Sequence, residues 1–255
     1  MKKAFAVVLA TQNPMKVMEV RNVLAGLSAN WRLFEPQELT RTPIEVEEDA
    51  DTLEGNAIKK AEAYSRLLLA GSVQENVLEG LEEVYVVGDD TGLEMDALNG
   101  EPGIKVRRWK DGKTAMKDEE LIEYCLMRMK DVPKEQRTAR FKAVLAAARL
   151  QRINNGKDWG PAEEPIQLFE GTLQGRILEE ADPLRLPGFP FESLFVVEEE
   201  ACRRAAQSGE QDPSAPGGVL LLGRIQQMEP AEKKRFPTHR QKAWESFLRH
   251  HNQQQ

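Results

Sequence analysis

A chain of 255 residues with 40% hydrophobic residues is long enough to bury a sizeable core. Its formal net charge of −7 argues against a protein that coats nucleic acid nonspecifically, so any anionic ligand must meet clustered lysines and arginines. Its two cysteines, Cys125 and Cys202, suggest neither a disulfide framework nor a cysteine metal site, and they indicate a reducing compartment.

The beginning of the chain predicts a strand and then a helix. The apolar run at residues 4–10 reads as a strand that is too short to span a bilayer, and no run of about 18 apolar residues occurs elsewhere. Asn13 is placed as an N-cap and Pro14 suits the first helical position. Because no apolar run is long enough to span a bilayer and the net charge is negative, we expect a cytoplasmic protein that binds neither a membrane nor a nucleic acid polymer.

A second helix and a second strand follow. Thr52 is placed as the cap of a helix whose apolar stripe extends to Leu68. Residues 84–87 read as a buried strand, and Gly88 is expected to break it directly before two aspartates.

The later elements are less uniform. Residues 118–130 predict a helix, and the last helix is predicted at about 239–248. Residues 139–150 are apolar, and the spacing of their hydrophobic side chains does not distinguish a strand from a helix, so both interpretations remain. Residues 168–177 read as a hairpin or a bent strand. This alternation predicts an α/β fold.

Residues 198–228 are the least regular stretch. Charge, two adjacent glycines and two prolines predict a surface insertion there. We find no internal repeat, so the chain is interpreted as one domain over residues 1–255 with this insertion inside it.

The paired aspartates raise a chemical question. Asp89 and Asp90 repel each other, so the site requires a compensating cation or a shared proton. The ends of strands in an α/β sheet are also where ligands usually bind. The pair is therefore the first candidate for an active site.

The loop ATQNPMK at residues 10–16 is the second candidate. Thr11, Asn13 and Lys16 precede or open a helix, where backbone N–H groups and the helix dipole favour a polyphosphate. The alternative is a plain helix cap. The loop is not a Walker motif, because GxxxxGK[ST] occurs nowhere in the chain.

Three further stretches each have two interpretations. Asn56 and Lys60 share a helix face that lines a cleft or is merely solvated. The aromatic rings near residue 190 stack on a nucleobase or belong to the core with a surface glutamate beside them. The segment before the last helix binds a ligand or is a solvated basic turn. The residues of the last two stretches are Phe189, Phe191, Glu192, Lys234, Thr238, His239 and Arg240.

Taken in order, these motifs resemble the inosine/xanthosine triphosphate pyrophosphatase family, also called Ham1-like. The stretches that carry the resemblance are ATQNPMK, TLEGNAIKKA, GDDTGLEMDALNGEPG, ARF, FEGTLQGRI, GFPFESLF and EKKRFPTHR. The resemblance implies a two-lobed α/β fold with a long mixed sheet, flanking helices and a central substrate cleft. It implies Mg²⁺-dependent hydrolysis of ITP, dITP and XTP to the monophosphate and pyrophosphate, commonly by a homodimer.

The resemblance also implies a role for each residue. Thr11, Asn13, Lys16 and Lys60 match phosphate-binding positions. Asp90 matches the general base and metal partner, and Asp89 supports it. Thr91 and Arg108 match substrate-contacting positions. The base-reading positions match Phe189, Phe191, Glu192, Lys234, Thr238, His239 and Arg240.

The chain departs from the family pattern at several positions, and those at residues 55 and 192 bear most directly on the site. Gly55 stands where a glutamate is usual, and Glu54 lies one position earlier, so the expected metal ligands are Asp90, Asp89 and Glu54. A shift of one residue rotates a helical side chain by about 100°. Glu192 stands where an aspartate is usual. An alternative function is therefore a nucleotide-binding sensor or interaction protein with weakened catalysis.

Overall fold

The structure, a computed structural model, describes residues 5–27, 31–40, 42, 44–74, 77–198 and 220–252. Its strands are β1 (Phe5–Ala10), β2 (Trp31–Phe34), β3 (Glu83–Met95), β4 (Pro102–Gly103), β5 (Thr138–Ile153), β6 (Asp158–Pro161), β7 (Gln167–Ile177) and β8 (Phe195–Val197). Its helices are α1 (Pro14–Leu27), α2 (Pro36–Leu39), α3 (Leu53–Leu69), α4 (Asp118–Arg128), α6 (Leu222–Gln227), α7 (Pro230–Lys233) and α8 (His239–Asn252).

The described strands form one mixed sheet of eight strands. The order is β2-β1-β3-β5-β7-β8, with β4 beside β3 and β6 beside β5. Strand β1 is parallel to β2 and β3, whereas the pairs β3–β4, β5–β6 and β7–β8 are antiparallel. The predicted α/β fold with a mixed sheet is confirmed, and the central cleft stays a prediction.

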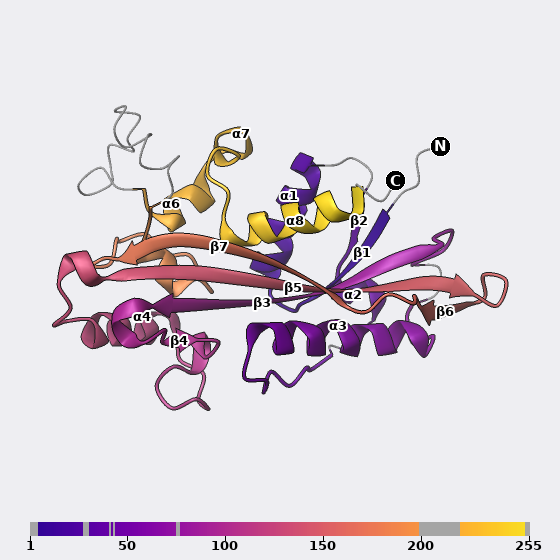
Figure 1. The fold of residues 1–255 in the computed structure, drawn as a ribbon, viewed down its shortest axis with the longest axis horizontal. Helices are drawn as coiled ribbons and strands as arrows, with labels where there is room; N and C mark the ends of the chain where they lie inside the picture. The colour runs from indigo at the N-terminus through magenta and orange to yellow at the C-terminus, as the bar shows by residue number, and fades with distance from the viewer. Residues whose placement is uncertain are drawn as a thin grey trace. The chain divides into compact units, whose positions relative to one another are not determined.

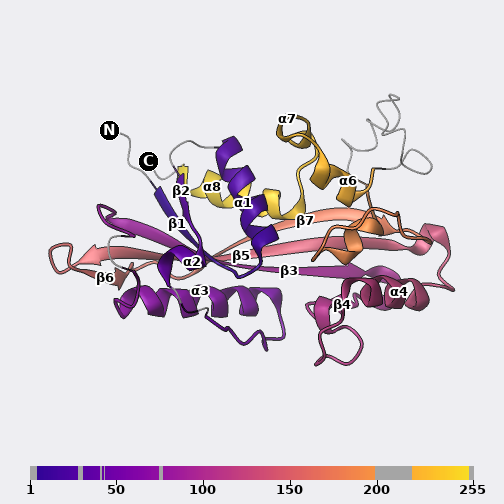
Figure 2. The same ribbon diagram turned by 180° about the vertical axis from the view of Figure 1, so that it is seen from behind.

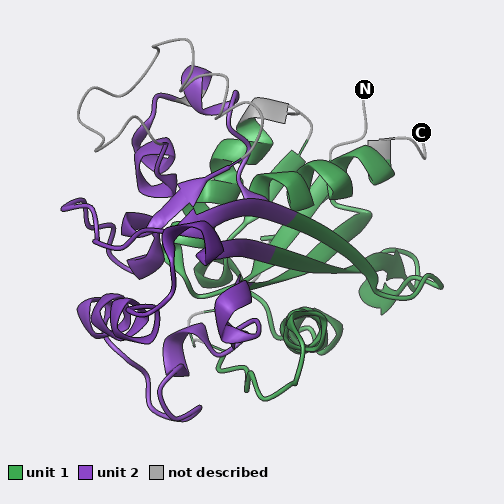
Figure 3. Cartoon of the chain, turned by 60° about the vertical axis from the view of Figure 1, so that its left-hand side comes forward, with its two compact units in different colours: residues 1–91, 143–171, 240–255 green, residues 92–142, 172–239 purple. Residues whose placement is uncertain are grey.

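The chain divides into two compact units, each built from separate segments (Figure 3). Unit 1 contains residues 1–91, 143–171 and 240–255, and unit 2 contains residues 92–142 and 172–239. The long strands β3, β5 and β7 each contribute residues to both units.

In unit 1, helices cover both faces of the sheet. Helix α3 lies on one face, and α1 and α8 lie on the other (Figures 1 and 2). Strand β1 is therefore buried along its whole length, as its unbroken apolar sequence requires. The core on the α1 and α8 side is rich in aromatic rings, including Trp31, Tyr85 and Phe247.

Unit 2 has its own core. Leu93 and Met95 from the end of β3 pack with Leu121 and Cys125 of α4 and with Phe195 of β8.

Among the described residues, no helix is both long enough and apolar enough to cross a membrane.

Several predicted elements are confirmed. Helix α1 begins at Pro14, and the side chain of Thr52 caps α3 by accepting a hydrogen bond from Gly55 N. The predicted helix at 118–130 is α4, and the last helix extends to Asn252. Residues 139–150, left open between helix and strand, belong to strand β5.

The predicted break at Gly88 is wrong. Strand β3 continues through Gly88 and both aspartates to Met95. A Cβ atom on Gly88 would lie 2.0 Å from the carbonyl oxygen of Ala57 on α3. Glycine is present because the backbones of β3 and α3 approach each other here, and not because the strand ends.

The predicted surface insertion at 198–228 is partly corrected. Residues 222–227 form α6, in which Leu222 and Ile225 are buried in the core of unit 2. Residues 199–219 lie outside the described residues, so an insertion there stays a prediction.

Candidate active site

The loop before α1 contains both a helix cap and a directed lysine. The side chain of Asn13 accepts a hydrogen bond from Met15 N at 3.0 Å, and the hydroxyl of Thr11 accepts one from Asn13 N at 3.2 Å. The ammonium of Lys16 lies 2.6 Å from Asp89 Oδ1 and donates to the carbonyl oxygen of Asp89 at 3.1 Å. The cap interpretation is thus confirmed for Asn13, and Lys16 joins the acidic pair.

Asp89 is enclosed by cations. Its side chain is fully buried, and Arg240 Nε donates to Asp89 Oδ2 at 2.8 Å while Lys16 pairs with the other oxygen. Burial alone raises the pKa of a carboxyl group, but Arg240 and Lys16 lower it by more, so the pKa of Asp89 lies well below its usual range. With both oxygens paired, Asp89 serves as an anchor for the two cations.

Asp90 has a different environment. It is 6% exposed, and its two oxygens accept from Lys60 Nζ at 2.7 Å and from Asn56 Nδ2 at 3.3 Å. Burial raises the pKa of Asp90 above its usual range, although Lys60 and Lys16 act in the opposite direction. A carboxylate with a raised pKa is suited to accept a proton, so Asp90 is the better base of the two.

Glu48 is a site residue that sequence reasoning missed. Its carboxylate lies 2.9 Å from Lys60 Nζ, the same ammonium that contacts Asp90. Glu54, the expected metal ligand, lies half-buried in the first turn of α3. Among the residues that the structure describes, no group of three or more His, Cys, Asp or Glu side chains is arranged to hold a metal ion.

Arg240 is held inside unit 1. It is 1% exposed, and besides Asp89 it contacts Glu19 and donates to the hydroxyl of Thr91 at 2.7 Å. These contacts join α1, the acidic stretch of β3 and the start of α8. The structure thus brings together seven predicted residues of unit 1, which are Lys16, Asn56, Lys60, Asp89, Asp90, Thr91 and Arg240.

In unit 2, the predicted aromatic pair is only partly in the core. Phe191 is 2% exposed and packs edge to face against Trp109 at 6.0 Å between ring centroids, whereas Phe189 is half-buried. Glu192 is 3% exposed, so the alternative of a surface glutamate is wrong. A buried carboxylate requires polar partners, which is consistent with a recognition role.

The segment before α8 is mostly buried as well. The ring of His239 stacks on Phe141 at 5.0 Å with 16° between the planes, and Thr238 is buried. The interpretation as a solvated basic turn therefore fails for both residues. Lys234 is exposed and Arg108 is half-buried.

Two residues that sequence reasoning did not single out hold the loop before Phe189. Gly188 N donates to Asp118 Oδ2 at 2.7 Å, and Arg107 contacts both Asp118 and the carbonyl oxygen of Gly188. The pair of Arg107 and Asp118 therefore fixes the turn that presents the aromatic residues.

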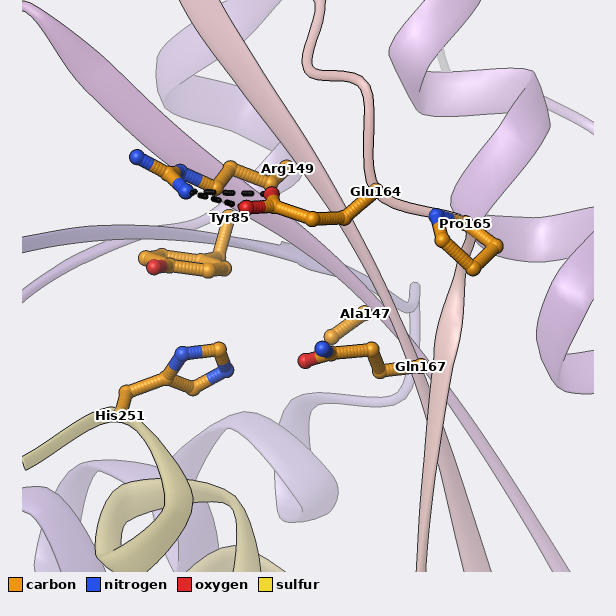
Figure 4. Close-up of a pocket in the computed structure, with 7 residues that line it drawn as sticks. All are labelled: Tyr85, Ala147, Arg149, Glu164, Pro165, Gln167 and His251. Carbon is orange, nitrogen blue, oxygen red and sulfur yellow. Dashed lines mark hydrogen bonds and ion pairs between the residues drawn. The ribbon is translucent and has the colours of Figure 1, made fainter. Parts of the chain in front are cut away.

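A separate cavity in unit 1 is too small for a nucleotide (Figure 4). It has a volume of about 10 Å³, room for about one water molecule. The ring of His251 lies against Tyr85 at 4.3 Å between centroids, and the amide of Gln167 lies beside it. Arg149 pairs with Glu164 at the cavity and with Glu83.

Comparison with known proteins identifies the family. The Ham1 family profile matches residues 7–214. A Symbiobacterium thermophilum protein named dITP/XTP pyrophosphatase is 37% identical over 190 residues, which cover 74% of this chain and 78% of that protein. A Vibrio parahaemolyticus protein of the same name is 32% identical over 242 residues, which cover 95% and 94%. The Staphylococcus aureus Ham1 structure covers 98% of this chain and 100% of that chain, with a TM-score of 0.62 and 23% identity, and supports the fold alone. The chain belongs to the Ham1 family.

Proposed function

We propose that this protein hydrolyses noncanonical purine nucleoside triphosphates, such as dITP, ITP and XTP, to the monophosphate and pyrophosphate. The names of the related proteins support this substrate class. The observation that carries the proposal is the acidic pair, in which one carboxylate is fully paired and the other has a raised pKa.

Asp90 acts as the general base. It accepts a proton from a water molecule, whose oxygen forms a bond to the α-phosphorus while the bond from that phosphorus to the bridging oxygen breaks. Pyrophosphate leaves with the electron pair of the broken bond. Asp89 keeps Lys16 and Arg240 in place, because both cations pair with its side chain.

Lys16 and Lys60 bind the phosphates. Both ammonium groups donate to the backbone carbonyl oxygen of Asp89, at 3.1 and 3.2 Å, so they converge on the acidic stretch of β3. Two converging positive charges favour the binding of a triphosphate and stabilise the charge of the leaving pyrophosphate. Thr11 and Asn13 shape the loop that places Lys16 on the first turn of α1.

The Mg²⁺ ion that the family resemblance implies fits part of the expected ligand set. Asp90 and Glu48 are hard oxygen donors that approach the same ammonium, so these two residues would hold the ion. Asp89 is the less available donor in this proposal, because its two oxygens pair with two cations, Lys16 and Arg240, whereas Asp90 pairs with one, Lys60. When bound, Mg²⁺ supplies positive charge that offsets the triphosphate.

Residues of unit 2 read the base in this proposal. These are Phe189, Phe191, Glu192, Lys234, Thr238 and His239. Arg240 of unit 1 belongs to the same predicted set, and Arg108 is proposed to contact the substrate. Aromatic rings stack on a purine, and a site that hydrogen-bonds a 6-oxo group rejects a 6-amino group by orders of magnitude. We further propose a homodimer in the cytoplasm.

The alternative of a weakened sensor was based on Gly55. Glu48 places a carboxylate at Lys60, the lysine that also contacts Asp90, without any side chain at residue 55, which supports the catalytic proposal over the sensor. The test is pyrophosphate release from dITP, ITP, XTP, GTP, ATP and pyrimidine triphosphates, with and without Mg²⁺. Release from the first three and not from ATP or GTP is the expected result, and nucleotide binding without release from any of them would contradict the proposal.

A further inference from the structure

The acidic stretch before α3, residues 44–52, lies against the first turns of that helix at three places. Ala50 N donates to Asn56 Oδ1 at 3.1 Å, and Glu48 pairs with Lys60 at 2.9 Å. A third contact joins Asp49 and Lys59, whose side chains are 54% and 42% exposed. We call residues 44–52 the acidic loop.

Both ends of the Asn56 amide are used. Asn56 is 3% exposed, its oxygen accepts from the acidic loop, and its nitrogen donates to Asp90 Oδ2 at 3.3 Å. A side chain that the sequence suggested for substrate binding therefore connects the loop to the proposed base. Such a bridge fixes the orientation of the Asp90 carboxylate, because Lys60 holds the other oxygen.

The absence of a side chain at Gly55 leaves room for the acidic loop to lie against α3. A Cβ atom at residue 55 would lie 2.7 Å from the Cβ atom of Ala50 and 3.2 Å from the hydroxyl oxygen of Thr52. The Cβ of Ala50 is attached directly to the loop backbone, so a side chain at residue 55 would displace the loop. The departure from the family pattern at Gly55 thus has a physical explanation in this chain.

We infer that Asn56 is a positioning residue and that Gly55 and Asn56 together dock the acidic loop on α3, so that Glu48 and Asp90 are held at the same lysine. Neither residue touches the reacting atoms in this arrangement. Asn56 acts through Asp90, and Gly55 acts by leaving room for Ala50. The kinetic consequence rests on the proposed function, whereas the docking itself does not.

Two measurements on the full chain test the inference. Hydrogen exchange at the amide of Ala50 reports docking of the loop, and steady-state kinetics with dITP report kcat and KM. Asn56→Ala removes both hydrogen bonds and is expected to speed exchange at Ala50 about tenfold or more. It is expected to lower kcat about tenfold to 100-fold with little change in KM, because the Asp90 carboxylate loses the hydrogen bond that fixes its orientation.

Two more variants separate the two ends of the bridge. Asn56→Asp keeps an acceptor for Ala50 N but has no donor for Asp90, so exchange should stay near the native rate while kcat falls. Gly55→Ala keeps Asn56 but displaces the loop, so exchange should rise and kcat should fall. Lys59→Gln is the matched control, since it removes only the exposed contact between the same loop and helix and should change neither quantity more than about twofold.

Each outcome decides the inference. Unchanged exchange at Ala50 in both Asn56→Ala and Gly55→Ala would overturn the docking. A raised KM with an unchanged kcat in Asn56→Ala would show that Asn56 binds substrate and would overturn the positioning role. If the native protein releases no pyrophosphate from any purine triphosphate, the proposed function fails, and the exchange measurement still decides whether the loop is docked.

Discussion

At the scale of single residues, two adjacent aspartates with the same sequence context have different environments. Asp89 is paired on both oxygens with Lys16 and Arg240, whereas Asp90 contacts one lysine and one amide. The difference arises from which side of β3 each side chain faces, because neighbouring residues of a strand point to opposite faces. Their substitutions should therefore have different effects.

Replacing Asp90 with asparagine should abolish turnover without unfolding the protein. The amide cannot accept a proton at neutral pH, and a general base contributes about 100-fold to 10,000-fold to the rate. Pyrophosphate release measures the loss, and thermal unfolding serves as the control. Retained turnover in Asp90→Asn would remove Asp90 from the role of base.

Replacing Asp89 with asparagine should instead destabilise the fold. The substitution leaves Lys16 and Arg240 without their shared carboxylate in a fully buried place, and breaking a buried ion pair costs about 3–5 kcal/mol. Denaturant unfolding of Asp89→Asn beside Asp90→Asn measures this difference. Equal stability of the two variants would contradict the assignment of Asp89 as an anchor.

The sequence identified most of these residues but not which of them pair with one another. Two neighbouring carboxylates require cations, and Lys16, Lys60 and Arg240 were all singled out. Glu48 was missed because it is one of several acidic residues before α3, a pattern that also suits the positive end of a helix dipole. No spacing rule tells which acid in such a run contacts Lys60.

At the scale of elements, β3 and α3 carry the site together. Asp89 and Asp90 lie on β3, and Asn56 and Lys60 lie on α3. The sequence suggested a break at Gly88 because glycine usually interrupts strands. In the structure, Gly88 instead allows the backbones of β3 and α3 to approach each other closely, which the local sequence does not reveal.

Gly88→Ala should therefore separate β3 from α3. The added Cβ would lie 2.0 Å from the carbonyl oxygen of Ala57, a backbone atom that cannot rotate away. Overpacking of this kind costs about 1–3 kcal/mol or more, and kcat should fall because Lys60 and Asp90 move apart. Denaturant unfolding and dITP turnover measure both effects.

A second glycine provides the control for Gly88→Ala. Gly156 has a φ of +81°, and no described atom lies within 4 Å of the place where its Cβ would be. Asparagine tolerates this left-handed region, so Gly156→Asn should change stability by less than about 1 kcal/mol. An equal loss in the two variants would show that the close approach at Gly88 is not the cause.

At the scale of the whole molecule, sequence periodicity predicts the elements better than their grouping. The alternation of strands and helices indicated an α/β fold, yet each unit is assembled from separated segments. Strands β3, β5 and β7 contribute to both units. The alternation of side chains along a strand does not reveal at which residue the strand passes from one unit to the other. The short strands β4, β6 and β8 were likewise absent from the prediction, since pairing rather than pattern defines them.

Stability as a function of pH reports on the core of unit 1 through His251. This histidine is 5% exposed, and neither ring nitrogen has a hydrogen-bond partner among the described residues. Burial, together with the charges of His250 and Arg149, lowers the pKa of His251 to about 4. In the unfolded chain the pKa of a histidine is about 6.5, so between these two values the unfolded state binds more protons.

The free energy of unfolding should therefore be fully retained above about pH 6.5 and should fall as the pH decreases toward about 4. One pKa unit corresponds to about 1.4 kcal/mol, so the loss attributable to His251 is about 1–3 kcal/mol. Carboxylates also titrate near the lower limit, so the measurement is the difference between the native protein and His251→Phe. Phenylalanine suits the aromatic surroundings formed by Trp31, Tyr85 and Phe247 but does not titrate. Urea unfolding at pH 7, 6 and 5 should show the native protein losing stability relative to the variant, and parallel curves would contradict a lowered pKa for His251.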